Sequence, residues 1–126
     1  MDLRNRRNIE CLMKLMEVRD VIAAPHIELA DRGLNVIFEL HAERMLISTA
    51  MSIEASDRDS HMRTIASRWR PEHSEGLPMR FFCTDMQLVV SAFLPAGSNA
   101  EAWYRIVKLQ RRYVESLRHT IDSHPD

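Results

Sequence analysis

The sequence predicts an α+β domain in which helices pack on a twisted, mainly antiparallel sheet. Residues 34–51 and 77–94 each contain two extended runs that a very short polar turn joins. Apolar residues with helical spacing occur before, between and after these two segments. The expected order is α-β-β-β-α-β-β-α, and runs of strands interrupted by single helices are typical of this fold class.

Length and composition indicate one globular domain. The 126 residues are 45% hydrophobic and 28% charged, which is enough chain to bury a core. We expect a single domain over residues 1–126, with a helix in 1–20, a sheet with one inserted helix in 26–94, and a helix in 98–121. The 17 Lys and Arg and the 18 Asp and Glu give a net charge of −1. This balance disfavours a dedicated nucleic-acid binder.

The N-terminal and apolar segments bear on where the protein works. MDLRNRRNIE lacks the apolar stretch of a signal peptide, and no apolar run approaches the length of a membrane span. Cys11 and Cys83 do not have the spacing of a metal knuckle or a redox pair, and free thiols are usual in a reducing compartment. We therefore expect a cytoplasmic protein, or one that acts at a membrane only through a partner.

The first half of the chain predicts one helix and three strands. Residues 3–19 carry an apolar stripe at helical spacing, and Pro25 requires the helix to end before it. A short strand over 26–30 precedes a turn at Gly33. Residues 34–40 alternate between apolar and mixed positions, and residues 44–53 continue as a third strand whose second face is small and only partly polar. Such a strand is often covered on both faces.

The second half predicts a short helix, a hairpin and a long helix. Asp59 or Ser60 can cap a helix that ends before Pro71, and residues 71–76 form a polar loop. Strands over 77–83 and 86–94 form a hairpin around Thr84-Asp85. Residues 98–101 have a capping-box pattern that opens the last helix, and residues 123–126 are expected to be a frayed tail.

No motif in the sequence indicates catalysis, a metal or a cofactor. None of the histidines stands in a local metal-binding spacing; these are His26, His41, His61, His73, His119 and His124. The three glycines form no phosphate-binding loop. We therefore expect no enzyme, although a site assembled only in space stays open. A basic set on the last helix leaves RNA binding as a minor alternative; it comprises Arg105, Lys108, Arg111, Arg112 and Arg118.

An additional apolar surface is indicated by the strands and by the methionines. Eight methionines are many for this length, and methionine is over-used on surfaces that accept several apolar ligands. In two strands the face opposite the expected core is less polar than a solvated face should be. A monomer cannot easily leave such a surface exposed, which favours a protein-binding function.

The chain resembles the class I chaperones of bacterial type III secretion systems, and especially the SycN-type chaperones of the gatekeeper protein. The stretches that carry the resemblance are HIELADRGLNVIFELHAERMLISTAM, GLPMRFFCTDMQLVVSAFLP and WYRIVKLQRRYVESL, within residues 26–118. The resemblance implies a small dimeric α/β protein without catalytic residues. It also implies an extended, largely unfolded N-terminal segment of a secreted gatekeeper or effector as the client, kept export-competent without ATP. The partner subunit is a second copy or a different small chaperone.

We assign expected surfaces on this basis. The face with Val36, Phe38 and Leu40 should pack on the helices. The opposite face should bind the client, with Ile37, Ile47, Val89 and Phe93 as its candidate residues. The middle helix and the following strand should form the subunit interface, with Ile65, Trp69, Met79 and Phe81 as candidates; Trp69 fits the core equally well. The main alternative is a cytosolic adaptor domain of the same fold without a secretion role.

Overall fold

The computed structural model describes residues 1–70 and 76–122 and confirms the predicted α+β order. The elements are α1 (Leu3–Leu15), β1 (His26–Asp31), β2 (Leu34–His41), β3 (Arg44–Ser52), the 3₁₀ turn η1 (Ala55–Asp57), α2 (Arg58–Arg68), β4 (Arg80–Cys83), β5 (Gln87–Phe93) and α3 (Ala100–Asp122). Residues 71–75 of the predicted loop over 71–76, and the predicted tail at 123–126, lie outside the described residues.

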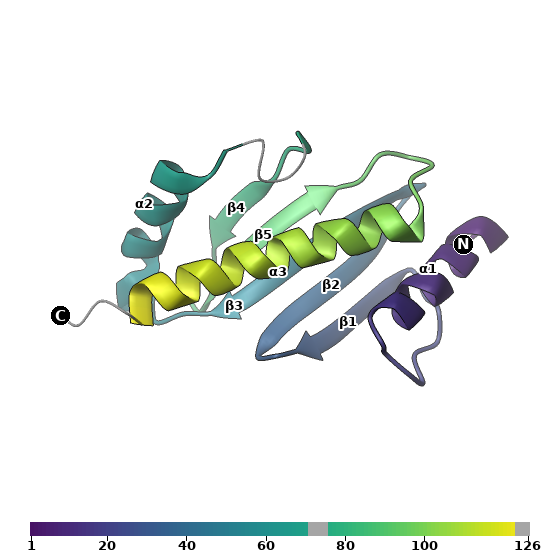
Figure 1. Cartoon of the computed structure of the whole chain (residues 1–126), viewed down its shortest axis with the longest axis horizontal. Coiled ribbons are helices and arrows are strands. Elements are labelled where there is room, and N and C mark those ends of the chain that lie inside the picture. The colour runs from purple at the N-terminus through teal and green to yellow at the C-terminus, as the bar shows by residue number, and fades with distance from the viewer. Residues whose placement is uncertain (71–75, 123–126) are drawn as a thin grey trace.

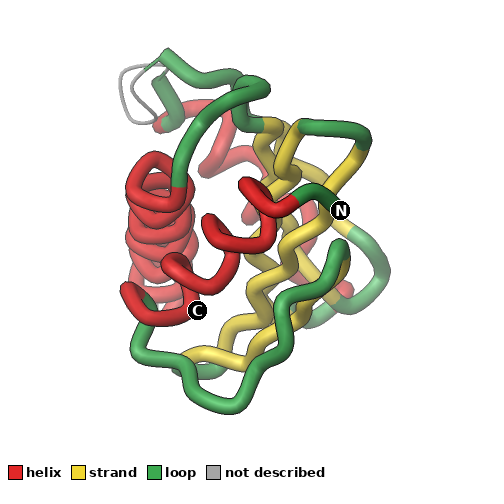
Figure 2. Tube along the Cα trace, turned by 90° about the vertical axis from the view of Figure 1, so that its right-hand side faces the viewer, coloured by secondary structure: helices red, strands yellow, loops and turns green. Residues whose placement is uncertain are grey.

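The strands form one antiparallel sheet in the order β1-β2-β3-β5-β4. Helix α3 runs diagonally across the sheet, and α1 lies at the end of the molecule near the start of α3 (Figure 1). Both helices lie on the same side of the sheet (Figure 2). Helix α2 packs against β4 and α3. One sheet face is therefore covered by α1 and α3, and β1 and β4 are the edges.

Backbone conformation decides where several elements begin and end. Helix α1 ends at Leu15, before the predicted residue 19, because Glu17 has a φ of 59°. The Glu17 amide donates to Lys14 and the Val18 amide to Met13, which together form a Schellman motif. Only glycine adopts this conformation without a steric cost, so no residue type in the sequence marks Glu17 as the end of the helix.

Two predicted helix caps are placed differently by the structure. Helix α2 begins at Arg58, directly after η1, and neither Asp59 nor Ser60 caps it. At the start of α3 the side chain of Asn99 accepts the hydrogen bond from the Ala102 amide. Both helices begin close to their predicted positions, because η1 leads directly into α2 and the Asn99 side chain caps α3.

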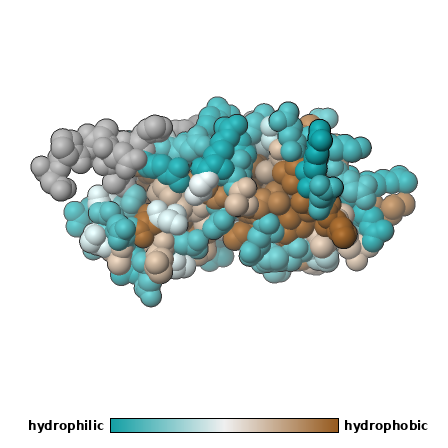
Figure 3. Space-filling view, turned by 90° about the horizontal axis from the view of Figure 1, so that it is seen from below, coloured by the Kyte–Doolittle hydropathy of each residue, from teal (hydrophilic) through white to brown (hydrophobic). Residues whose placement is uncertain are grey.

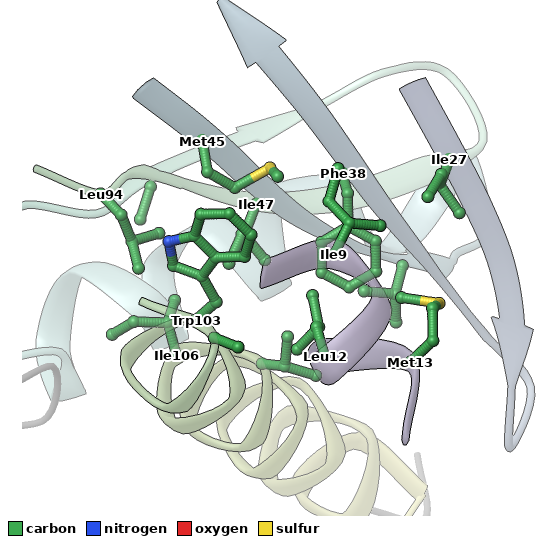
Figure 4. Close-up of a cluster of buried hydrophobic side chains, with 14 residues drawn as sticks. Ile9, Leu12, Met13, Ile27, Phe38, Met45, Ile47, Leu94, Trp103 and Ile106 are labelled. Atoms are coloured by element: carbon green, nitrogen blue, oxygen red, sulfur yellow. The ribbon is translucent and has the colours of Figure 1, made fainter. Parts of the chain in front are cut away.

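The core between the sheet, α1 and α3 confirms that the face with Val36, Phe38 and Leu40 packs on the helices. Figure 4 shows Trp103 of α3 and Ile9 of α1 pointing toward this face. The Trp103 ring is buried, and its indole nitrogen donates to the Ser98 hydroxyl at 2.9 Å. A buried indole N–H normally requires such a partner.

A buried polar contact joins α3 to the middle of the sheet. The Thr49 hydroxyl donates to Gln110 Oε1 at 2.8 Å, and Gln110 Nε2 donates to the Ile47 carbonyl at 3.0 Å. Thr49 and Gln110 are both fully buried. Burying a polar group without a hydrogen-bond partner costs free energy. A shift of α3 along β3 would break these hydrogen bonds, so the contact holds α3 at one position.

Replacing Gln110 by leucine should destabilise the protein by about 1–3 kcal/mol, since the Thr49 hydroxyl and the Ile47 carbonyl lose their partner. The double variant Thr49→Val/Gln110→Leu should cost less than the sum of the two single changes. Urea unfolding measures both quantities, with Ser52→Ala on an exposed position as the control. If Gln110→Leu lowers the free energy of unfolding by less than about 0.5 kcal/mol, the prediction is wrong, because changes of that size are typical of surface substitutions.

Candidate functional site

The sheet face that α1 and α3 leave uncovered contains a groove of about 960 Å³. Its apolar lining comes mainly from residues that alternate with the core set along β2, β3, β5 and β4. These residues are Ile37, Leu46, Val89, Phe93 and Phe82. Leu77 and Pro78, which precede β4, close one side. We call this feature the open-face groove.

The floor of the open-face groove is polar at its centre. Ser48 on β3 and Ser91 on β5 pair across the two strands, and their hydroxyl oxygens are 2.7 Å apart. Ser48 is 6% exposed and Ser91 is 7% exposed. Each hydroxyl satisfies the other, so the buried polar atoms do not prevent apolar side chains from entering the groove.

Charged side chains flank the apolar lining. Glu28 and Glu39 stand over β1 and β2, and the two nitrogens of the His26 ring contact their carboxylates at 3.2 and 3.1 Å. On the other side, the Arg44 guanidinium lies over the Phe93 ring at 4.9 Å, in the range of a cation–π contact. Arg80 on β4 lines the groove beyond Phe93.

Three of the four predicted client-binding residues, Ile37, Val89 and Phe93, line the open-face groove. The fourth, Ile47, was predicted to face the client, and the structure corrects this prediction. It pairs with Phe38 and Ala92, and side chains of directly paired residues share a sheet face, so it lies in the core and is 0% exposed. The hairpin register placed it there, and the alternation within β3 alone does not reveal which set faces the helices.

Sequence reasoning missed several groove residues that the register brings together. Leu46 occupies the place that Ile47 was expected to fill, because it pairs with Phe93 across β3 and β5. Glu28 and Arg80 come from the two edge strands, more than fifty residues apart in sequence. The alternation of each strand predicted which residues share a face within that strand, but the strand order was needed to combine them.

The predicted subunit-interface residues gather around α2 and β4. The rings of Trp69 and Phe81 meet edge-on with centroids 5.8 Å apart, and Phe81 also packs against Tyr113 of α3 at 5.4 Å. Trp69, Phe81 and Met79 are half-buried, whereas Ile65 is 5% exposed and packs inward. The three half-buried side chains therefore remain available to a partner, and Ile65 supports them from within.

A second apolar area lies at the end of the molecule where α1 meets the β1 edge. Figure 3, which views the molecule from below Figure 1, shows a continuous hydrophobic area on this side. Half-buried Val18, Val21 and Leu29 pack against the core here, and Ile22 is 87% exposed. Among the strands of residues 1–70 and 76–122, β1 pairs only with β2, so an apolar area adjoins a sheet edge that can accept another strand.

A separate cavity of about 930 Å³ lies between the ends of β3 and β5, the start of α2 and Arg118. His61 of α2 is buried in its wall, and its Nδ1 has no hydrogen-bond partner in the part of the chain that the structure describes. Burial lowers the pKa of His61, and the nearby Asp57 carboxylate partly opposes this effect. His61 is therefore held as the neutral imidazole more strongly than an exposed histidine.

The described residues offer little to catalysis. No group of three or more His, Cys, Asp or Glu side chains within residues 1–70 and 76–122 is arranged to hold a metal ion. Burial raises the pKa of the Cys83 thiol, and a thiol with a raised pKa is a poor nucleophile. In the same ranges no helix is both long and apolar enough to cross a membrane.

Comparison with known proteins places the chain in a family. The family model described as SsaM matches residues 2–117. The secretion system apparatus protein SsaM of Salmonella typhimurium (strain LT2) is 24% identical over 115 residues, which are 91% of this chain and 93% of that protein. Both matches span nearly the whole sequence.

Two solved structures share the fold. A chain of the ExsC–ExsE complex aligns with a TM-score of 0.68 and 17% identity, covering 94% of this chain and 96% of the other. YbjN, described as a putative transcription regulator from E. coli, aligns with a TM-score of 0.53 and 14% identity, covering 88% and 86%. With the family match, these findings confirm the resemblance to the type III secretion chaperones that the sequence indicates.

The buried imidazole should make stability depend on pH. Because burial lowers the folded-state pKa of His61, the unfolded chain binds the proton more readily, and stability falls as pH drops below the unfolded value of about 6.5. His61→Phe should therefore lose less stability than the wild type between pH 7.5 and pH 5. Urea unfolding at both pH values tests this, and equal losses in the two proteins would contradict it.

Proposed function

Because this chain belongs to the SsaM family, we propose that it acts as a non-enzymatic type III secretion chaperone in the bacterial cytoplasm. It binds an extended N-terminal segment of a secreted gatekeeper or effector and keeps that segment soluble and competent for export. The open-face groove is the observation that carries this proposal, since a long apolar hollow on a sheet suits an unfolded segment better than it suits a small substrate.

The energetics of the groove suit reversible binding. Each large apolar side chain that leaves water and enters the groove contributes about 1.5–3 kcal/mol, and ordering a flexible segment offsets part of that gain. Ile37 and Phe93 are half-buried before any client binds, so a client adds to an existing apolar surface. The fold match to a chain crystallised in complex with ExsE supports a protein partner.

The edge of β1 offers a second way to hold the same client. An extended segment can add a strand to a free edge and place alternate side chains on the neighbouring surface. Beside this edge lie Ile22 and the half-buried Val18 and Val21. A client long enough to reach both surfaces gains affinity from their joint occupation.

Trp69, Met79 and Phe81 form the proposed contact with a second subunit. Trp69 directly follows α2, Met79 precedes β4 and Phe81 lies in β4, and the three side chains belong to one apolar cluster. Aromatic side chains are favoured at subunit contacts. The partner is a second copy or a different small chaperone. This surface is distinct from the open-face groove, apart from Phe81, which also lines the groove.

Phe93→Asp should abolish most client binding, because an entering apolar side chain would meet a carboxylate that loses its hydration. The assay is copurification with an N-terminal fragment of a type III secretion gatekeeper from the same bacterium, followed by titration of the two purified chains. We expect at least about a tenfold loss of affinity, equivalent to about 1.4 kcal/mol. Arg105→Asp, on the exposed side of α3, is the matched control, and equal binding by the two variants would exclude the groove.

Trp69→Asp should weaken subunit association without changing the fold. The change places a charge among the Phe81 and Tyr113 rings at the proposed contact. Analytical ultracentrifugation should show a shift from dimer to monomer, or loss of the heteromeric partner. Ile22→Asp, at an exposed position outside this contact, should leave association unchanged. A wild type that stays monomeric at high concentration and needs no partner chain would refute the dimer proposal.

A further inference from the structure

The charges around the open-face groove are segregated by sign, and this separation points to the kind of segment that binds there. We propose that the client segment has an apolar centre, a basic side chain at the end over β1 and β2, and an acidic side chain at the end over β4. This inference rests on the proposed function, because it assigns the chemistry of the client to the same groove. It makes the groove selective among apolar segments.

One row of paired residues crosses all five strands. Glu28 pairs with Ile37, Ile37 with Ser48, Ser48 with Ser91, and Ser91 with Arg80. Directly paired residues point to the same face, so the row runs from a carboxylate through the groove to a guanidinium. Neighbouring strands are about 4.8 Å apart, so the two charged ends are separated by about 19 Å.

This length fixes the spacing in the client. An extended segment advances about 3.3 Å per residue. A basic side chain at Glu28 and an acidic side chain at Arg80 therefore lie about six positions apart in the client sequence. The side chains between them meet Ile37, the serine pair and the neighbouring Val89 and Phe93. A segment of this pattern satisfies both ends of the groove and its apolar centre at the same time.

The flanking charges are available to a client. Within residues 1–70 and 76–118, Arg80 takes part in none of the ion pairs of this chain. Glu28 and Glu39 share His26, Glu39 also contacts His41 at 3.7 Å, and both carboxylates lie on the β1 and β2 side of the groove. Arg44, the other cation lining the groove, lies over Phe93 rather than beside these carboxylates. The field along the groove therefore has one direction, and a complementary segment is favoured over one with like charges at both ends.

A second copy of this chain is the competing occupant. Two copies related by a twofold axis could place Glu28 of each opposite Arg80 of the other, because a row with unlike ends is self-complementary. We favour the client segment because the family match and the proposed subunit contact at Trp69 leave this face for a different partner. The oligomeric state of the Arg80→Glu variant distinguishes a client segment from a second copy as the occupant of the groove.

The test uses three dye-labelled peptides that share the apolar centre Leu-Val-Ser-Val-Leu. One carries Lys before the centre and Asp after it, one carries Lys at both ends, and one carries Asp at both ends. A peptide with the two charges exchanged is no control, because an extended segment can enter the groove in either direction. Fluorescence anisotropy should show that the wild type binds the mixed peptide about threefold more tightly than either like-charged peptide.

Reversal of one groove charge should reverse this preference. In Arg80→Glu both ends of the row are acidic, so this variant should bind the Lys/Lys peptide most tightly, and the ratio of the two affinities should change by about tenfold. Arg105→Glu makes the same charge change on the outer side of α3 and should keep the wild-type preference.

The outcomes separate this inference from the proposed function. Equal affinities for all three peptides in the wild type and in Arg80→Glu, or no binding of the mixed peptide at millimolar concentration, would overturn the inference. If Phe93→Asp still abolishes copurification of the gatekeeper fragment, the proposed function stands without it. If Arg80→Glu changes only the oligomeric state, a second copy occupies the groove and the inference fails.

Discussion

The register between β2 and β3 places Phe38 opposite Ile47, and the remaining structure depends on this pairing. The two strands are joined at Ala42 and Glu43, and Ala42 has a φ of 56°, a conformation that costs a non-glycine residue energy. A slip of one residue would turn the side chains of β3 to the opposite face. With the observed register, one face supplies a core for α1 and α3, and the other supplies the open-face groove.

Two polar contacts hold α3 against that sheet and so keep the two faces distinct. Gln110 binds Thr49 and the Ile47 carbonyl inside the core. The next residue of α3, Arg111, forms an ion pair with Asp31 at the end of β1. Because each contact has directional requirements that apolar packing lacks, α3 is fixed both along β3 and across to β1. The helices complete the core without covering the other face.

Alternation and helical spacing predicted the fold class, the element order and the residues that share a face within each strand. They could not predict the sheet order, which is a long-range property, and without it Ile47 was assigned to the wrong face. The end of α1 was also misplaced, because a Schellman motif with Glu17 in the left-handed region has no glycine to mark it. Glu28 and Arg80 lie at opposite ends of the groove because of the order of all five strands. The sequence of a single strand does not reveal this arrangement.

The high number of methionines supported the prediction of an additional apolar surface, but the groove is built from other residues. Met45 and Met51 lie in the core, and the groove is lined by branched and aromatic side chains such as Ile37, Val89 and Phe93. Methionine gives a surface that adapts to many ligands, whereas β-branched side chains have few rotamers. On the proposed function, a stiff lining with charges of opposite sign at its ends would select client segments by shape and by charge. Such a groove suits a chaperone dedicated to few clients better than one that accepts any unfolded chain.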